Sequence, residues 1–130
     1  MDIKTEPRSG VDFGKQGEQM AVDYLIDKGY SIMERNFVCG KNEVDIIARN
    51  KQEIVFIEVK TRATHAFGEP EEAVNIRKQR LIIAVANAYI VKCDIDLEAR
   101  FDIISIVDNM DGKPQINHII AAFSPLVSSY

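Results

Sequence analysis

Two consecutive apolar runs, both interrupted by charged residues, constrain this chain more than any other part of the sequence. They are EVDIIAR (43–49) and EIVFIEVKT (53–61), and only the polar NKQ separates them. β-Branched and aromatic residues dominate both runs, which predicts two neighbouring strands joined as a hairpin. Asp45, Glu58 and Lys60 nevertheless lie within these strands. Buried carboxylates are costly unless they are paired, hydrogen-bonded or bound to metal, so these groups need a chemical reason.

The hairpin register predicts that these groups meet. Side chains alternate along a strand, so Glu58 and Lys60 share one face of the sheet. A turn centred between residues 51 and 52 places Asp45 opposite Glu58, and Glu43 opposite Lys60. Directly opposed residues have Cβ atoms roughly 4.5–5.5 Å apart, which is a bridging distance for one divalent cation. We therefore expect two carboxylates and an ammonium group on one patch.

The residue types in this patch favour cation chemistry. Mg²⁺ and Mn²⁺ prefer hard oxygen ligands, keep some of their waters and accept phosphate oxygens. Such an ion stabilises charge on a phosphate and lowers the pKa of a bound water. An adjacent lysine can orient that water or neutralise developing charge. The pattern predicts a metal-dependent site for phosphodiester cleavage, and a cross-strand salt-bridge cluster on a solvated sheet face is the alternative.

A fourth acid, Glu18, lies on a predicted helix. Its neighbours at helical spacing are Gly14, Ala21 and Leu25, so Glu18 borders the core-facing stripe. We expect this carboxylate to reach the edge of the sheet and complete the outer shell of the metal. A boundary glutamate that is partly in solvent is an equally simple interpretation.

Basic residues around the loop RATHAFGEP (62–70) are the candidate DNA contacts. Arg62 begins the loop, and Arg77, Lys78 and Arg80 follow it on a predicted helix. We expect these residues to bind a phosphate backbone. Lys78 also borders the packed face of that helix and could reach the acidic patch, whereas a solvated helix surface is the simpler interpretation.

Periodicity and turn residues predict an α/β domain, with a mixed sheet of about five strands flanked by helices in the order αβββαββ. The expected helices span 11–28, closed by Gly29, and 70–91, opened by Pro70. The expected strands span 30–37, 43–49, 53–61, 100–108 and 114–120, with irregular structure after them. The residues expected on the packed face of the second helix are Val74, Leu81, Val85 and Ala88. We expect a flexible tail over residues 1–10 and a single domain over 11–130.

Composition narrows the classes of protein. The 130 residues, 46% of them hydrophobic, allow one domain with a real core. The polar N-terminus predicts no signal peptide, and the longest apolar stretch, 81–91, is far too short to cross a bilayer. Cys39 and Cys93 stand singly, which indicates reduced thiols in a cytoplasmic protein. The net charge of −4 argues against general nucleic-acid affinity, so DNA contacts must rely on a local basic patch.

Several of these motifs occur together in one known family. The segments GKQGEQMAVDYLIDKGYSIMERNF, NEVDIIA, IVFIEVKTR and GEPEEAV, then KxxL and AxxY, follow one another in order. In this respect the chain, from about Phe13 to Phe123, resembles the YraN-like family of predicted endonucleases. That family is related to archaeal Holliday-junction resolvases and to the restriction-endonuclease-like fold. The resemblance implies the Asp…Glu-x-Lys nuclease motif, with Asp45 as metal-binding aspartate, Glu58 and Lys60 as the paired strand residues, and Glu18 as the first-helix glutamate.

Three hypotheses follow for function. The first is a Mg²⁺- or Mn²⁺-dependent endonuclease that acts on DNA, including branched or structured DNA, with Glu18, Asp45, Glu58 and Lys60 as catalytic residues. Related nucleases often work as dimers, so a homodimer is one expected assembly, and no membrane partner is expected. The second is a DNA- or protein-binding module with an idle nuclease-like site. The third is a structural domain whose carboxylates only pair with Lys60 and Arg62.

Overall fold

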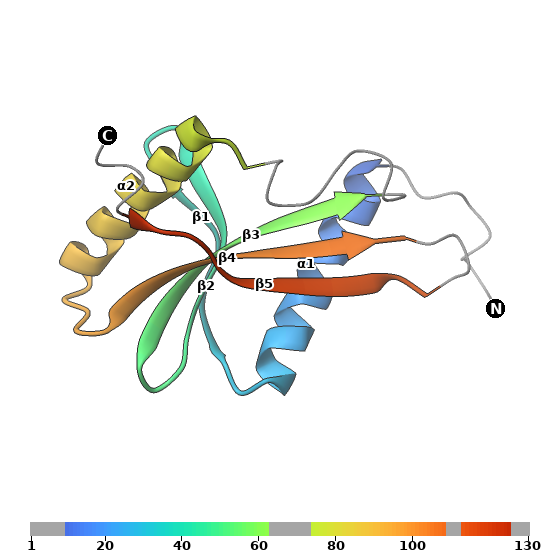
Figure 1. The fold of residues 1–130 in the computed structure, drawn as a ribbon, viewed down its shortest axis with the longest axis horizontal. Coiled ribbons are helices and arrows are strands. Elements are labelled where there is room, and N and C mark those ends of the chain that lie inside the picture. Colours follow the sequence, from blue (N-terminus) through green and yellow to red (C-terminus); the bar gives the residue numbers. More distant parts are fainter. Residues whose placement is uncertain (1–9, 63–73, 109–112, 126–130) are drawn as a thin grey trace.

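The chain folds as a sheet with one helix on each face (Figure 1). A computed structural model describes residues 10–62, 74–108 and 113–125. The elements within these residues are α1 (Gly10–Asp27), β1 (Ser31–Cys39), β2 (Asn42–Arg49), β3 (Glu53–Arg62), α2 (Ile76–Lys92), β4 (Glu98–Val107) and β5 (Gln115–Phe123). The predicted α/β fold, with five strands in the order αβββαββ, is confirmed. The predicted tail lies outside the described residues except for Gly10, where α1 begins.

The five strands follow one another in the sheet as they do in the sequence. Neighbouring strands are antiparallel except for β3 and β4, which run parallel from the pair Glu53–Glu98 to the pair Arg62–Val107. A parallel pair needs a crossover connection, and α2 lies within that connection. The consequence is that the N-terminal end of α2 follows the carboxyl end of β3, where Glu58 and Lys60 lie.

Two apolar layers fix which way the side chains of β3 point. Val55 and Ile57 are buried under α1, whereas Ile54 and Phe56 are buried under α2. Because successive side chains of a strand alternate between faces, Glu58 continues the row that faces α2. The apolar core therefore ends on that side where the predicted patch begins.

The regular alternation of β2 breaks at Asp45. Val44 belongs to the core beneath α2, but Ile46, only two residues later, belongs to the core beneath α1. Asn36 of the neighbouring strand β1 has a left-handed backbone, with φ 50°. The β2–β3 ladder also ends here, at the pair Ile46–Ile57. Figure 1 shows that β2 and β3 run in different directions beyond the part where they pair. Asp45 precedes Ile46, the last paired residue of β2, so it lies where the two strands separate.

Two expectations about helix α2 are wrong. Val74 and Asn75 precede the helix, which starts at Ile76 because the Asn75 side chain caps it by accepting a hydrogen bond from the backbone N–H of Lys78 at 2.9 Å. Leu81 and Ala88 are exposed, whereas Val74 and Val85 are buried as expected. The buried face consists of Ile82, Ile83, Val85, Ala86 and Tyr89. Both faces have helical spacing, and packing against the sheet selects the one with the larger side chains.

The C-terminal strand is longer than expected. The sequence predicts its end at residue 120, but β5 continues through Phe123. Ala121 adopts a left-handed backbone, with φ 54°, and the Phe123 ring stacks on Phe101. The contact with β4 therefore accompanies a strand that continues beyond an irregular residue.

Neither described helix is long and apolar enough to cross a membrane, and both cysteines are free thiols.

Candidate functional site

Where β2 separates from β3, a backbone N–H of β3 loses its partner in the ladder, and the Asp45 side chain accepts a hydrogen bond from it. The predicted register is confirmed from Ile46–Ile57 through Arg49–Ile54. Asp45 and Glu58 would form the next pair, but the backbone N–H of Val59 instead donates to Asp45 Oδ2 at 2.8 Å. The carboxylate thus replaces a backbone acceptor at the end of the ladder. The predicted pairing of Glu43 with Lys60 is wrong, because the ladder has ended before it and Glu43 is exposed.

Glu58 is the most deeply buried acid of the patch. Only 6% of its side chain is exposed. Its Oε2 lies 3.8 Å from Lys60 Nζ on the same strand and 3.4 Å from Lys78 Nζ on α2. Its Oε1 is buried and has no hydrogen-bond partner among the described residues. A buried carboxylate oxygen with no donor costs free energy, so a cation or a hydrogen-bond donor placed beside it would be stabilising.

The environment of Asp45 disfavours its ionised form. Burial raises the pKa of Asp45, the carboxylates of Glu58 and Glu18 raise it further, and the Val59 hydrogen bond only partly offsets them. The resulting pKa is about 7, compared with 3.8 for an ordinary aspartate. A protonated Asp45 can donate to Glu58, which explains how two neighbouring carboxyl groups coexist at neutral pH. Perturbed carboxyl pairs of this kind are typical of functional sites.

Glu18 lies on the first half of α1, half-buried, and acts on Asp45 through its charge. The described residues contain no set of three His, Cys, Asp or Glu side chains that together could hold a metal ion. The structure therefore brings Asp45 and Glu58 together as a pair and leaves Glu18 as a nearby charge. Two carboxylates are a usual protein contribution to a Mg²⁺ site, since that ion keeps several waters and binds substrate phosphate.

A close contact between α1 and β3 fixes the position of Glu18. The preceding residue, Gly17, is buried, and a Cβ atom there would collide with Cγ2 of Thr61. Thr61 follows Lys60 on β3. Glycine therefore allows the helix to approach the strand that carries the acidic patch, and it sets how near the Glu18 carboxylate lies to Asp45.

We expect Gly17→Ala to destabilise the protein by about 1–3 kcal/mol despite the better helix propensity of alanine, because the contact with Thr61 is overpacked. Thr61→Ser removes the colliding methyl group and should restore stability to the double variant. Gly14→Ala is the matched control: a Cβ at Gly14 meets nothing within 4 Å, so this change should stabilise by about 0.5–1 kcal/mol. Urea unfolding of the four variants measures these effects; an equal gain from both alanines would refute the contact.

The basic residues predicted to bind DNA take different positions. Lys78 reaches the acidic patch, as one of its two interpretations held. Arg77 and Arg80 are exposed on the first turns of α2. Arg62 ends β3, half-buried, and its carbonyl accepts a hydrogen bond from the backbone N–H of Asp108 at 2.8 Å. Most of the loop between Arg62 and α2 lies outside the described residues.

A second polar cluster, the Asp102 network, was missed by sequence reasoning apart from one contact. Because Asp102 starts a predicted strand, the sequence predicts that it pairs with Arg35 or Arg100. The structure pairs it with Arg100, whereas Arg35 donates to Gln19. His118 Nε2 lies 2.7 Å from Asp102 Oδ2, and its Nδ1 lies 3.1 Å from the Tyr24 hydroxyl. These groups come from α1, β4 and β5, so no pattern within one segment of the sequence predicts their contact.

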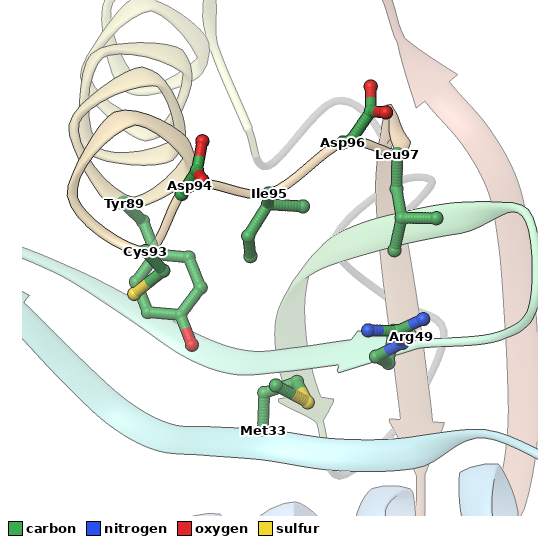
Figure 2. Close-up of a pocket in the computed structure, with 8 residues that line it drawn as sticks. All are labelled: Met33, Arg49, Tyr89, Cys93, Asp94, Ile95, Asp96 and Leu97. Carbon is green, nitrogen blue, oxygen red and sulfur yellow. The ribbon is translucent and has the colours of Figure 1, made fainter.

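A pocket at the far end of α2 is separate from both clusters. It has a volume of about 390 Å³ and lies between the end of α2 and strands β1 and β2 (Figure 2). Its lining residues are Met33, Arg49, Tyr89, Cys93, Asp94, Ile95, Asp96 and Leu97. Helix α2 has 17 residues and is therefore about 25 Å long, and Lys78 marks its other end. None of the four predicted catalytic residues lines this pocket.

Sequence comparison places the chain in a family. Residues 17–106 match UPF0102, described as an uncharacterised protein family, and the chain belongs to this family. A UPF0102 protein of Phocaeicola vulgatus is 52% identical over 114 residues, covering 88% of this chain and 93% of the relative. One from Caldanaerobacter subterraneus subsp. tengcongensis is 44% identical over 113 residues, covering 85% and 93%. One from Bacteroides thetaiotaomicron is 43% identical over 114 residues, covering 88% and 93%.

Proposed function

We propose that this protein is a Mg²⁺- or Mn²⁺-dependent endonuclease that hydrolyses phosphodiester bonds in DNA, with branched or structured DNA among its substrates. The observation that carries the proposal is the pair of half-buried Asp45 and buried Glu58, beside Lys60, where two strands separate. The pKa of Asp45 is raised to about 7, and Glu58 has a buried oxygen that finds no hydrogen-bond partner in the part of the chain that the structure describes. The resemblance to resolvase-like nucleases, carried by the same residues, gives the reaction class.

The donor set fits a hard divalent cation. Asp45 and Glu58 would hold it, with Glu18 adding negative charge nearby, and all three offer only oxygen ligands. Once bound, the ion would supply a more acidic water and charge stabilisation on the phosphate. A cation would also give Glu58 Oε1 the partner that it lacks among the described residues. The like charges that raise the pKa of Asp45 would then be neutralised.

The chain's own residues contribute orientation and charge. Lys60 Nζ lies 3.8 Å from Glu58, so its ammonium is held over the patch and can orient an attacking water or neutralise charge on the phosphate. The Val59 N–H fixes one oxygen of Asp45 and leaves the other available. Because Glu58 and Asp45 stand on different strands, the rigid sheet sets the spacing between them.

The direct test is cleavage of duplex, single-stranded and four-way-junction DNA with Mg²⁺ or Mn²⁺. We expect cleavage by the natural protein and a loss of at least about a hundredfold in Glu58→Gln, because a charged ligand is removed without a change of shape. Glu43→Gln is the matched control, since Glu43 is exposed on the same hairpin. Mn²⁺ should also raise the melting temperature of the natural protein and of Glu43→Gln, but not that of Glu58→Gln.

Two results would contradict the proposal. Absence of a Mn²⁺-dependent melting shift in the natural protein would remove the cation site. Tight DNA binding without cleavage, unchanged by Glu58→Gln, would instead favour a binding module with an idle site. The small number of basic residues near the patch and the net charge of −4 are the reasons for testing this alternative.

A further inference from the structure

Lys78 contacts the acidic patch from outside the sheet. Its ammonium lies 3.4 Å from Glu58 Oε2, closer than that of Lys60 at 3.8 Å. The Lys78 side chain is 40% exposed, compared with 6% for Glu58. The Lys78 side chain thus contacts a buried carboxylate and is also accessible to solvent. Because it is long, its ammonium group can change partner without any movement of the backbone.

Lys78 lies at the positive end of the helix dipole, where a cation is disfavoured, and without a metal ion the Glu58 carboxylate at 3.4 Å offsets this. The first turn of α2 contains no acidic residue, although acids are favoured at this end by the helix dipole. Arg77 and Lys78 occupy that turn, and Arg80 follows in the next one. Cations at a helix N-terminus repel the partial positive charge of the free backbone N–H groups. An anion bound in front of this turn would be attracted by the dipole and by the side chains together.

A count of charges around Glu58 indicates which anion fits. With Asp45 ionised, as cation binding would require, three carboxylates, those of Glu18, Asp45 and Glu58, lie around two ammonium groups, those of Lys60 and Lys78. A divalent cation would overcompensate the remaining negative charge by one unit, and a single phosphodiester would restore neutrality. When the cation takes over Glu58, the ion pair with Lys78 becomes redundant and the ammonium is released.

We propose that Lys78 is a phosphate-binding residue of this site, paired with Glu58 before the cation arrives and transferred to a phosphodiester oxygen of the substrate afterwards. This inference rests on the proposed function, since it assigns the second ligand of the same site. The proposal gives the two lysines different roles. Lys60, on the same strand as Glu58, stays with the carboxylates, whereas Lys78 holds the substrate in front of α2. Substrate affinity should therefore depend on the cation.

The test uses DNA binding as well as cleavage. Affinity for a four-way junction and for a duplex is measured with Ca²⁺ and with EDTA, with gels that confirm intact DNA. We expect Ca²⁺ to strengthen binding by the natural protein, and Lys78→Met to lose this gain by about tenfold or more. Lys78→Arg, which keeps the charge, should retain most of it. Lys92→Met is the matched control, because Lys92 is an exposed lysine on the last turn of the same helix.

Two further readouts separate phosphate binding from support of Glu58. The Mn²⁺-dependent melting shift of Lys78→Met should equal or exceed that of the natural protein, because a competitor of the cation has been removed. Under cleaving conditions KM should rise more than kcat falls. Binding by Lys78→Met that equals Lys92→Met, or a lost Mn²⁺ shift, would overturn the proposal.

The two proposals fail separately. Cation-dependent DNA binding that needs Lys78, without any cleavage, would leave the phosphate site standing and end the endonuclease assignment. Cleavage that needs Glu58 but is indifferent to Lys78→Met would leave the endonuclease standing and end this assignment.

Discussion

Asp45→Asn is expected to make the metal-free protein more stable while it removes cation binding and cleavage. The change eliminates a buried charge that lies beside Glu58 and near Glu18. An asparagine can still accept the Val59 hydrogen bond through its side-chain oxygen, and its amide can donate to the unpartnered Oε1 of Glu58. Stability and function are thus opposed at this position, as is common where a site is built from like charges.

The gain should depend on pH in a defined direction. The pKa of Asp45 is raised from 3.8 to about 7 in the folded state. Between these values the folded protein retains a proton that the unfolded chain releases, so the contribution of Asp45 to stability falls as pH rises from about 4 to about 7. The asparagine variant lacks this titration. Its advantage should be small near pH 4 and complete at pH 8, where we expect about 1–3 kcal/mol.

Urea unfolding in EDTA at pH 5 and pH 8 measures this difference, and Mn²⁺ titration of the melting temperature measures the lost cation site. Asp23→Asn is the matched control, because Asp23 is an exposed acid on α1 that accepts a hydrogen bond only from Gln19 among the contacts of the described residues. An Asp45→Asn protein that is less stable than the natural one at pH 8 would show that the carboxylate is stabilising there, contrary to its like-charge surroundings.

Local pattern was sufficient to predict the core of this site. Alternation along a strand is a property of consecutive residues, so the shared face of Glu58 and Lys60 follows from the sequence alone. The hairpin register follows from the short NKQ connection, and it holds from Ile46 to Arg49. What the pattern could not give is the end of the ladder. The alternation breaks at Asp45, near left-handed Asn36 of β1, where the β2–β3 ladder ends.

Features that depend on packing between distant segments were predicted less well. Two helix-spaced faces compete on α2, and periodicity cannot show which of them meets the sheet. The sequence predicts that Pro70 opens α2, but the helix starts at Ile76 after the N-cap residue Asn75. The contact between Lys78 and Glu58 joins a helix to a strand, so it was only one of two interpretations of the sequence. The Asp102 network joins residues up to 94 positions apart.

That network should supply the largest single contribution of any polar group to stability. Asp102 is completely buried. Its carboxylate accepts from His118 Nε2 at 2.7 Å, from Arg100 Nη2 and Nε at 2.7 and 2.9 Å, and from the backbone N–H of Ala121 at 2.9 Å. The last of these bonds lies where the β4–β5 register shifts, between Phe101 and Ile103. The side chain therefore substitutes for a strand acceptor, as Asp45 does at the end of the β2–β3 ladder.

Burial alone would raise the pKa of Asp102, but the hydrogen bonds from His118, Arg100 and Ala121 outweigh burial and lower it. A lowered pKa means that the stabilisation is present above the unfolded value, near 4, and is lost as pH falls through the folded value. The Asp102 carboxyl is therefore ionised at neutral pH. Arg100 also donates to Glu53 at 2.7 Å, so removal of Asp102 would leave a mostly buried guanidinium with only part of its partners.

Asp102→Ala is accordingly expected to cost about 3–5 kcal/mol at pH 7, the usual penalty for breaking a buried, hydrogen-bonded charge pair. Urea unfolding of Asp102→Ala, Arg100→Ala and the double variant gives the coupling energy between the two groups, which should exceed about 1.5 kcal/mol. Asp96→Ala, an exposed aspartate, should change stability by less than about 0.5 kcal/mol.

Because the network lies beneath α1 and the acidic patch faces α2, the Mn²⁺-dependent melting shift should persist in Asp102→Ala. Its loss would show that the two clusters are coupled through the sheet, and a cost near that of Asp96→Ala would show that the buried pair contributes little to the fold.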